Sequence, residues 1–218
     1  MLIENEIKQG DCTTVLRTMP AKSVDLVVTD PPYLVSYRSR DGRAVLNDDC
    51  PENVLSCFPD LYRVLKPDSL CVCFYGWGKV DAFFDAWTGA GFRPVGHIVW
   101  AKNYASHTGY LKACHEQAYL LAKGHPPKPQ TPICDVQPWQ YTGNNLHPTQ
   151  KAISVFTPLI EAFSAPGDLV LDPFAGSGSA CVAAARAGRR YVGIELDARY
   201  CEIARERLAD PHYFQRAA

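Results

Sequence analysis

The sequence predicts an α/β protein built on a single doubly wound, mostly parallel sheet. In the last third of the chain, short buried strands alternate with helices, an order typical of a parallel sheet covered on both faces. Three predicted strands end at or just before an acidic residue, namely Asp30, Asp172 and Glu195. Ligands of such sheets bind beyond the carboxyl ends of the strands, so these three acids are expected to line one site.

Length and composition fit one globular domain over residues 1–218. The chain is 47% hydrophobic and 21% charged, and no stretch is apolar for long enough to span a bilayer. The first six residues lack the basic flank and apolar core of a signal peptide. The nine cysteines include no C-x-x-C pair, which indicates reduced thiols and argues against a zinc site. We therefore expect a cytoplasmic protein with no membrane partner and no metal.

The first half of the chain supplies elements of both kinds. An opening strand leads to Asp11, and a short buried strand over residues 24–28 ends at Asp30, where two prolines prevent its continuation. Residues 52–65 carry apolar side chains at helical spacing. The elements expected next are a strand over 70–75, a helix around 79–90, strands over 95–100 and 115–121, and a long surface loop over 126–145.

The last third of the chain predicts a nucleoside pocket. Strands are expected over 169–171 and 191–194, and helices over 179–187 and 198–208. In the turn from Asp172 to Gly178, two glycines let the backbone approach a ligand next to the free amides of a helix N-terminus. Glu195 ends the next strand, where a carboxylate can accept hydrogen bonds from ribose hydroxyls.

Signals for a bound phosphate are missing from the same region. A dinucleotide fingerprint would need glycine at 181, where the chain has Cys181, and no Gly-Lys-Ser/Thr P-loop is present. The pocket is therefore expected to take a nucleoside without a di- or triphosphate, and S-adenosylmethionine fits that description.

Asp30-Pro31-Pro32-Tyr33 predicts chemistry on an amino group. The lone pair of a nucleobase amino nitrogen is delocalised, so two acceptors that hold its hydrogens would make it a better nucleophile. The Asp30 carboxylate and the Pro31 carbonyl can supply these acceptors, and neither proline has an N–H to donate. Tyr33 offers a flat face on which a flipped base can stack.

Together these residues resemble the amino-methyltransferase family of DNA enzymes. Asp30 to Tyr33 matches the catalytic motif of that family, and Asp172 to Gly178 matches its adenosylmethionine-binding motif. The catalytic motif comes first, which is similar to the β group, and the resemblance extends over nearly the whole chain. It implies a circularly permuted Rossmann-like methyltransferase fold whose termini lie close together, catalysis by Asp30, Pro31, Pro32 and Tyr33, and methyl transfer to adenine N6, since Asp at the first motif position usually accompanies adenine.

The resemblance also implies the contacts of the cofactor, S-adenosyl-L-methionine. Gly10-Asp11-Cys12 resembles the stretch that holds its adenine, and the strand that ends at Glu195 resembles the ribose-binding strand. His147 to Lys151 resembles the segment that binds its methionine moiety, although Ala152 replaces the usual proline. The implied cofactor-binding residues are Asp11, Cys12, His147, Thr149, Lys151, Asp172, Phe174, Gly176, Gly178 and Glu195.

A DNA partner requires local positive charge, because the net charge of the chain is −1. The loop 34–49, just after Tyr33, carries three arginines, and a short target-recognition insertion is expected around 103–146. Within that insertion, DNA contact and plain structural support remain equally open for the segment that contains Tyr104, His107, Tyr110, Lys112 and His115. The candidate DNA-binding residues are Arg38, Arg40, Arg43, Tyr110 and Lys112. Because many β-group members dimerise, a homodimer is also expected.

Several other functions remain open at this stage. The same chemistry could act on cytosine N4 of DNA, on an RNA adenine or on a protein glutamine, although the protein-glutamine enzymes usually begin the tetrapeptide with Asn. A non-catalytic binding subunit would be expected to lose Asp30 or Tyr33, and both are present. Cys181 disfavours a nicotinamide-dependent enzyme.

Overall fold

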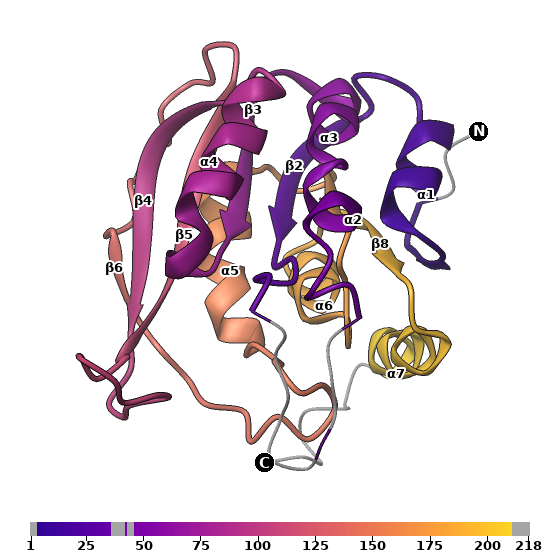
Figure 1. Ribbon diagram of the computed structural model, residues 1–218. Coiled ribbons are helices and arrows are strands. Elements are labelled where there is room, and N and C mark those ends of the chain that lie inside the picture. Colours follow the sequence, from indigo (N-terminus) through magenta and orange to yellow (C-terminus); the bar gives the residue numbers. More distant parts are fainter. Residues whose placement is uncertain (1–3, 36–41, 43–45, 211–218) are drawn as a thin grey trace.

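The computed structural model describes residues 4–35, 42 and 46–210. Its centre is one eight-stranded sheet (Figure 1), whose strands lie in the order β1 (Glu6–Gln9), β8 (Arg190–Glu195), β7 (Leu169–Asp172), β2 (Val24–Thr29), β3 (Leu65–Phe74), β5 (His115–Lys123), β4 (Arg93–Ala101) and β6 (Val136–Pro138). Of these strands, β5 runs antiparallel to β3 and β4, and the other neighbouring pairs are parallel. The predicted mostly parallel α/β sheet is confirmed.

Helices cover both faces of the sheet, as Figure 1 shows. One face carries α1 (Cys12–Thr18), α2 (Pro51–Leu55), α3 (Phe58–Val64) and α4 (Val80–Gly89), with a 3-10 helix, η1 (Trp77–Lys79), before α4. The other face carries α5 (Ile153–Phe163), α6 (Ser179–Arg186) and α7 (Ala198–Ala209). The sheet is therefore doubly wound, as expected.

Alternating side chains of the strands divide the core into two layers. On β3, Cys71 and Cys73 point into the layer under α3 and α4, and Val72 points into the layer under α5 and α6. Aromatic rings fill the centre of each layer: Phe58, Phe83 and Trp87 in the first, and Phe74, Trp100 and Phe156 in the second. Both faces of the central strands are thus buried, which makes the sheet a rigid support.

Two predicted elements differ from the structure. The single helix expected over 52–65 is interrupted between α2 and α3, because Pro59 has no N–H to donate to the preceding turn and stands at the start of a new helix. The loop expected over 126–145 contains the short edge strand β6, which pairs with β4 and ends at Pro138. The other predicted strands and helices are confirmed, with boundaries that shift by a few residues.

The first and last described elements lie side by side. Arg205 of α7 donates from Nη2 to the carbonyl of Ile7 in β1 at 2.7 Å, and β1 pairs with β8, the strand that precedes α7. The terminal residues lie outside the described ranges, so the closeness of the termini stays a prediction. Within the described ranges, no helix is long and apolar enough to cross a membrane.

The turn between β7 and α6 requires glycine. Gly176 and Gly178 have φ angles of +51° and +79°, in the left-handed region. A Cβ at Gly178 would also lie 2.8 Å from the Cβ of Ala204 on α7, closer than packed carbons allow. The backbone path over the carboxyl end of β7 therefore depends on having no side chain at this position.

Gly178→Ala is expected to destabilise the fold by about 2–4 kcal/mol, because left-handed strain of about 1 kcal/mol adds to an overpacking penalty of about 1–3 kcal/mol. Gly188→Ala is the matched control, because Gly188 has a similar φ of +73° and no atom within 4 Å of the added Cβ. Urea unfolding of both variants measures the difference. Equal losses of stability would contradict the close contact with Ala204.

Candidate active site

A cavity of about 820 Å³ opens beyond the carboxyl ends of β1, β2, β7 and β8. It is lined by most of the catalytic and cofactor-binding residues expected from sequence, together with a second set from the β4–β5 connection and the segment before α5. The expected residues in its wall are Asp11, Cys12, Asp30, Pro31, Pro32, Tyr33, His147, Thr149, Lys151, Phe174, Gly176 and Glu195. Asp172 lines a small adjoining pocket, whereas Gly178, the last residue of the turn, packs against Ala204 and lines neither cavity. Apart from Gly178, the cofactor and catalytic candidates thus share one site.

Glu195 and Asp172 shape the turn that borders this cavity. Glu195 accepts from the Gly176 amide through Oε2 and from the Asp197 amide through Oε1, both at 2.8 Å. Asp172 accepts from the Phe174 amide at 3.1 Å. Partial burial raises the pKa of Glu195, and full burial, with the nearby charges of Asp30 and Glu195, raises the pKa of Asp172 to about 8.

Asp11 begins α1 just after β1, next to the strand end that carries Glu195. Its Oδ1 accepts from the Thr14 amide at 2.9 Å and from the Thr14 hydroxyl at 3.0 Å, which is an N-cap. The cap fixes the turn that places Cys12 in the cavity wall. Asp11 also lines the cavity.

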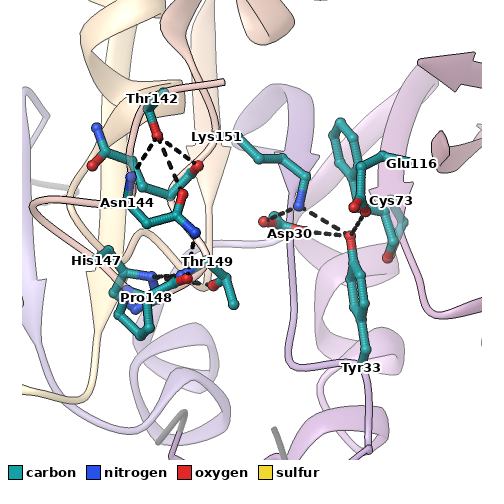
Figure 2. Close-up of polar contacts among 12 residues, drawn as sticks. Asp30, Tyr33, Cys73, Glu116, Thr142, Asn144, His147, Pro148, Thr149 and Lys151 are labelled. Atoms are coloured by element: carbon teal, nitrogen blue, oxygen red, sulfur yellow. Dashed lines mark hydrogen bonds and ion pairs between the residues drawn. The ribbon is translucent and has the colours of Figure 1, made fainter. Parts of the chain in front are cut away.

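His147 to Lys151 crosses the cavity from the cofactor side to the catalytic side. His147 Nδ1 accepts from the Thr149 amide at 3.3 Å, and the His147 ring lies edge-on to Tyr200 with centroids 4.3 Å apart. Asn144, which also lines the cavity, donates to the Pro148 carbonyl at 2.8 Å and so stabilises the bend (Figure 2). The segment thus places His147 beside the glycine turn and carries Lys151 toward Asp30.

The charges of the cavity suit a cation without phosphate groups. Asp11, Asp172 and Glu195 gather around the glycine turn. Among the described residues in the wall, the Lys and Arg side chains are Lys102 and Lys151, and each is already paired with an acid. Among the described wall residues a phosphate would find no unpaired ammonium, whereas a sulfonium would lie in a cavity lined by the carboxyls of Asp11 and Glu195. The residues present therefore fit S-adenosylmethionine.

Four polar groups meet at the catalytic tetrapeptide (Figure 2). The Tyr33 hydroxyl donates to Asp30 Oδ1 at 2.9 Å and lies 3.3 Å from Glu116 Oε2. Lys151 Nζ donates to the Tyr33 hydroxyl oxygen at 3.0 Å and forms an ion pair with Asp30 Oδ2. The Tyr33 backbone and Cβ pack on Gly76, where any added Cβ would lie 3.0 Å away.

Lys151 contacts Asp30, the expected catalytic residue. The resemblance assigns this residue to the methionine moiety of the cofactor, yet its ammonium, on a side chain only 5% exposed, pairs with Asp30 and also lies 4.6 Å from the Phe74 ring centre. Burial raises the pKa of Asp30, and the Lys151 charge opposes that rise. Burial raises the pKa of Tyr33 well above its usual value, so Tyr33 stays a neutral hydroxyl.

The wall opposite the cofactor half is aromatic. Trp139 Nε1 donates to the Tyr104 hydroxyl at 3.0 Å, and the Tyr104 and Tyr141 rings meet edge-on with centroids 5.6 Å apart. Lys102 lies under this wall, with Nζ 5.1 Å from the Trp139 ring, and forms an ion pair with Glu116. Sequence reasoning missed Glu116, Lys102 and Trp139, because no local pattern marks them.

The connection between β4 and β5 is a protruding hairpin beside this aromatic wall. Ser106 and Ala113 pair across it, and Thr108 bridges to Lys112. Tyr110 at its tip is fully exposed, and Leu111 is 83% exposed. The strand β5 follows directly, so it occupies the middle of the predicted insertion 103–146. Arg38, Arg40 and Arg43 lie outside the described residues.

Known proteins resemble this chain along nearly all of its length. A family model for DNA methylases matches residues 24–206. YubD of Escherichia coli (strain K12) is 52% identical over 201 residues, which cover 92% of this chain and 88% of YubD. The DNA adenine methyltransferase YhdJ of the same strain is 28% identical over 247 residues, which cover 94% of this chain and 83% of YhdJ.

Solved structures share the fold. TTHA0409 of Thermus thermophilus, in complex with S-adenosyl-L-methionine, matches with a TM-score of 0.71 at 25% identity and covers 94% of this chain and 95% of that one. The cytosine-N4-specific PvuII DNA methyltransferase matches with a TM-score of 0.74 at 18% identity, over 99% of this chain and 90% of that one. This match shows a likeness of fold alone. Because the family model spans most of the residues and the relatives extend over almost the whole length, this chain belongs to the DNA methylase family, as an S-adenosyl-L-methionine-dependent DNA methyltransferase of the N4/N6 type.

Proposed function

We propose that this methyltransferase modifies N6 of adenine at specific DNA sites, after the target base has been flipped out of the duplex. The observation that carries the proposal is the position of Asp30, which lines the same cavity as the glycine turn and bonds to the hydroxyl of the stacking residue Tyr33. The name of YhdJ, a relative that acts on DNA adenine, also supports this base.

The tetrapeptide provides what an exocyclic amino group needs. An Asp30 oxygen accepts a hydrogen bond from one amino hydrogen, and the Pro31 carbonyl accepts one from the other. Held in this way, the nitrogen can direct its lone pair at the methyl group of the cofactor. Stacking on Tyr33 contributes about 1–3 kcal/mol, which offsets part of the few kcal/mol that extrusion of the base costs. Asp30 must be ionised to act in this way, and the adjacent Lys151 ammonium favours that form.

The cofactor half supplies orientation. S-adenosyl-L-methionine, when bound, provides an electrophilic methyl group on a positively charged sulfur. Asp11, Cys12 and Glu195 would hold its nucleoside part, and the turn with Phe174 and Gly176 together with His147 and Thr149 would hold its amino-acid part. Aligning the nitrogen with this methyl group accounts for much of the rate enhancement.

The alternative is the same reaction at cytosine N4 of DNA or at an RNA adenine. Both amino groups present two hydrogens to the same acceptors, and the cytosine-N4-specific PvuII enzyme shares the fold. The Asp at position 30 favours adenine by association within the family.

DNA contacts are proposed for two short elements. The hairpin tip with Tyr110 and Lys112 projects beside the cavity, and the arginines Arg38, Arg40 and Arg43 follow Tyr33 in the chain. A homodimer would extend the DNA footprint of this single, small domain. All nine cysteines are free thiols, which supports a cytoplasmic location.

The methylated product identifies the base directly. Digestion of duplex DNA after reaction, followed by mass spectrometry of the nucleosides, is expected to give N6-methyladenine, and RNA of the same sequence should be a poorer acceptor. N4-methylcytosine as the main product would contradict the proposal and favour the alternative.

Asp30→Ala should lower kcat by about 10³-fold or more, because one of the two amino-group acceptors is lost. Cofactor affinity, measured by calorimetry, should change little. Asp85→Ala, at an exposed position on α4, is the matched control. Parallel loss of methyl transfer and cofactor binding would show that Asp30 serves the cofactor or the fold.

The ionisation of Asp30 predicts a pH effect. Its pKa is raised by burial, so activity should fall as the pH drops through that raised value and the carboxylate becomes protonated. Lys151→Met removes the opposing positive charge, so the fall of kcat at low pH, the acid limb of its pH profile, should move to higher pH. Lys151→Arg should leave this acid limb nearly in place. Lys128→Met is the surface control. An acid limb that does not move in Lys151→Met would refute the assigned role of Lys151.

A further inference from the structure

The Tyr33 hydroxyl lies between two carboxylates. Its oxygen is 2.9 Å from Asp30 Oδ1, at the end of β2, and 3.3 Å from Glu116 Oε2, at the start of β5 (Figure 2). A phenol has a single hydrogen, so it can donate a strong hydrogen bond to one of these carboxylates at a time. Lys151 donates to the same oxygen at 3.0 Å. The Tyr33 O–H can therefore point either to Asp30 or to Glu116.

Each carboxylate keeps a cation of its own. Lys151 pairs with Asp30, and Lys102, whose side chain is 4% exposed, pairs with Glu116. Lys102 is held in turn by the Trp139 ring, 5.1 Å from its Nζ. Neither acid therefore needs the Tyr33 hydrogen for charge balance, and Glu116 Oε2, 3.3 Å from the Tyr33 oxygen, can accept it after a small approach of the two groups.

In this geometry both oxygens of Asp30 are engaged, Oδ1 by Tyr33 and Oδ2 by Lys151. Each carboxylate oxygen has two lone pairs, so the incoming amino group would share Oδ1 with Tyr33 unless the Tyr33 O–H turns away and leaves that oxygen to the amino group alone. The O–H of Tyr33 can do so by rotation about its Cζ–Oη bond, with no covalent bond broken and no proton transferred.

We propose that Glu116 is a positioning residue that takes the Tyr33 hydrogen bond when the target amino group reaches Asp30, and so frees Oδ1 to accept from that group. This inference rests on the proposed role of Asp30. Glu116 itself need not touch the base. Its contribution is to provide the alternative acceptor, 83 residues away in sequence from Tyr33.

Glu116→Gln tests the exchange. The Lys102 ammonium will attract the amide oxygen, so the amide NH₂ will face Tyr33 and the acceptor becomes a donor. Tyr33 then stays on Asp30, and kcat should fall about 10- to 100-fold, the equivalent of one hydrogen bond to a charged group. The KM for the cofactor should change by less than about twofold, because losing an interaction that acts only during the reaction lowers kcat without changing binding.

The decisive comparison is a double-mutant cycle with Tyr33→Phe. Phenylalanine keeps the ring for stacking and removes the hydroxyl, so Tyr33→Phe alone should cost less than Glu116→Gln. In the Tyr33→Phe background, Glu116→Gln should change kcat by less than about twofold, since no O–H remains to redirect. Glu161→Gln, on the exposed side of α5, is the control.

An equal fold-loss from Glu116→Gln in both backgrounds would overturn this inference and leave the adenine proposal intact. Full activity of Asp30→Ala would instead remove the proposed function on which it rests. If Glu116→Gln does not fold, Glu116→Leu together with Lys102→Met removes the acceptor without leaving a buried charge unpaired. This double substitution should also lower kcat when Tyr33 is present and change it by less than about twofold in the Tyr33→Phe background. An equal loss in both backgrounds would again overturn the inference.

Discussion

The ion pair between Lys151 and Asp30 is the interaction on which the rest of the site depends. A buried carboxylate would tend to take up a proton, and a protonated Asp30 could not accept from an amino group in the same way. Lys151 reaches Asp30 from the segment that also carries His147 and Thr149 to the cofactor side. Lys151 therefore favours the charged form of Asp30, the proposed catalytic residue, and links the two halves of the cavity.

The sheet makes this arrangement possible. Four parallel strands end at the same edge, so Asp11, Asp30, Asp172 and Glu195 converge although they are far apart in the sequence. The buried layers on both sides hold those strand ends in place. The cofactor half is acidic and shaped by a glycine turn, whereas the substrate half is aromatic and supported by the Lys102–Glu116 pair.

The sequence predicted the parts of the site that follow strands, because Asp, Gly and Pro stop a strand locally and leave a readable mark. Asp30-Pro31-Pro32-Tyr33 and the turn at Gly176 and Gly178 are of this kind. It did not predict where Lys151 points, nor Glu116, whose partners Tyr33 and Lys102 lie on other elements and meet it only through tertiary packing. The split at Pro59 and the edge strand β6 were missed for a related reason: short elements are decided by their neighbours more than by their own residues.

The central claim, that Asp30 accepts a hydrogen bond from the target amino group, is tested most directly by a crystal structure of this enzyme with a cofactor analogue and a duplex that contains the target adenine. The account predicts the adenine N6 within about 3.2 Å of an Asp30 oxygen and of the Pro31 carbonyl oxygen, with the base stacked on Tyr33. A flipped base whose amino group contacts neither oxygen, with Asp30 still bonded only to Lys151 and Tyr33, would contradict it.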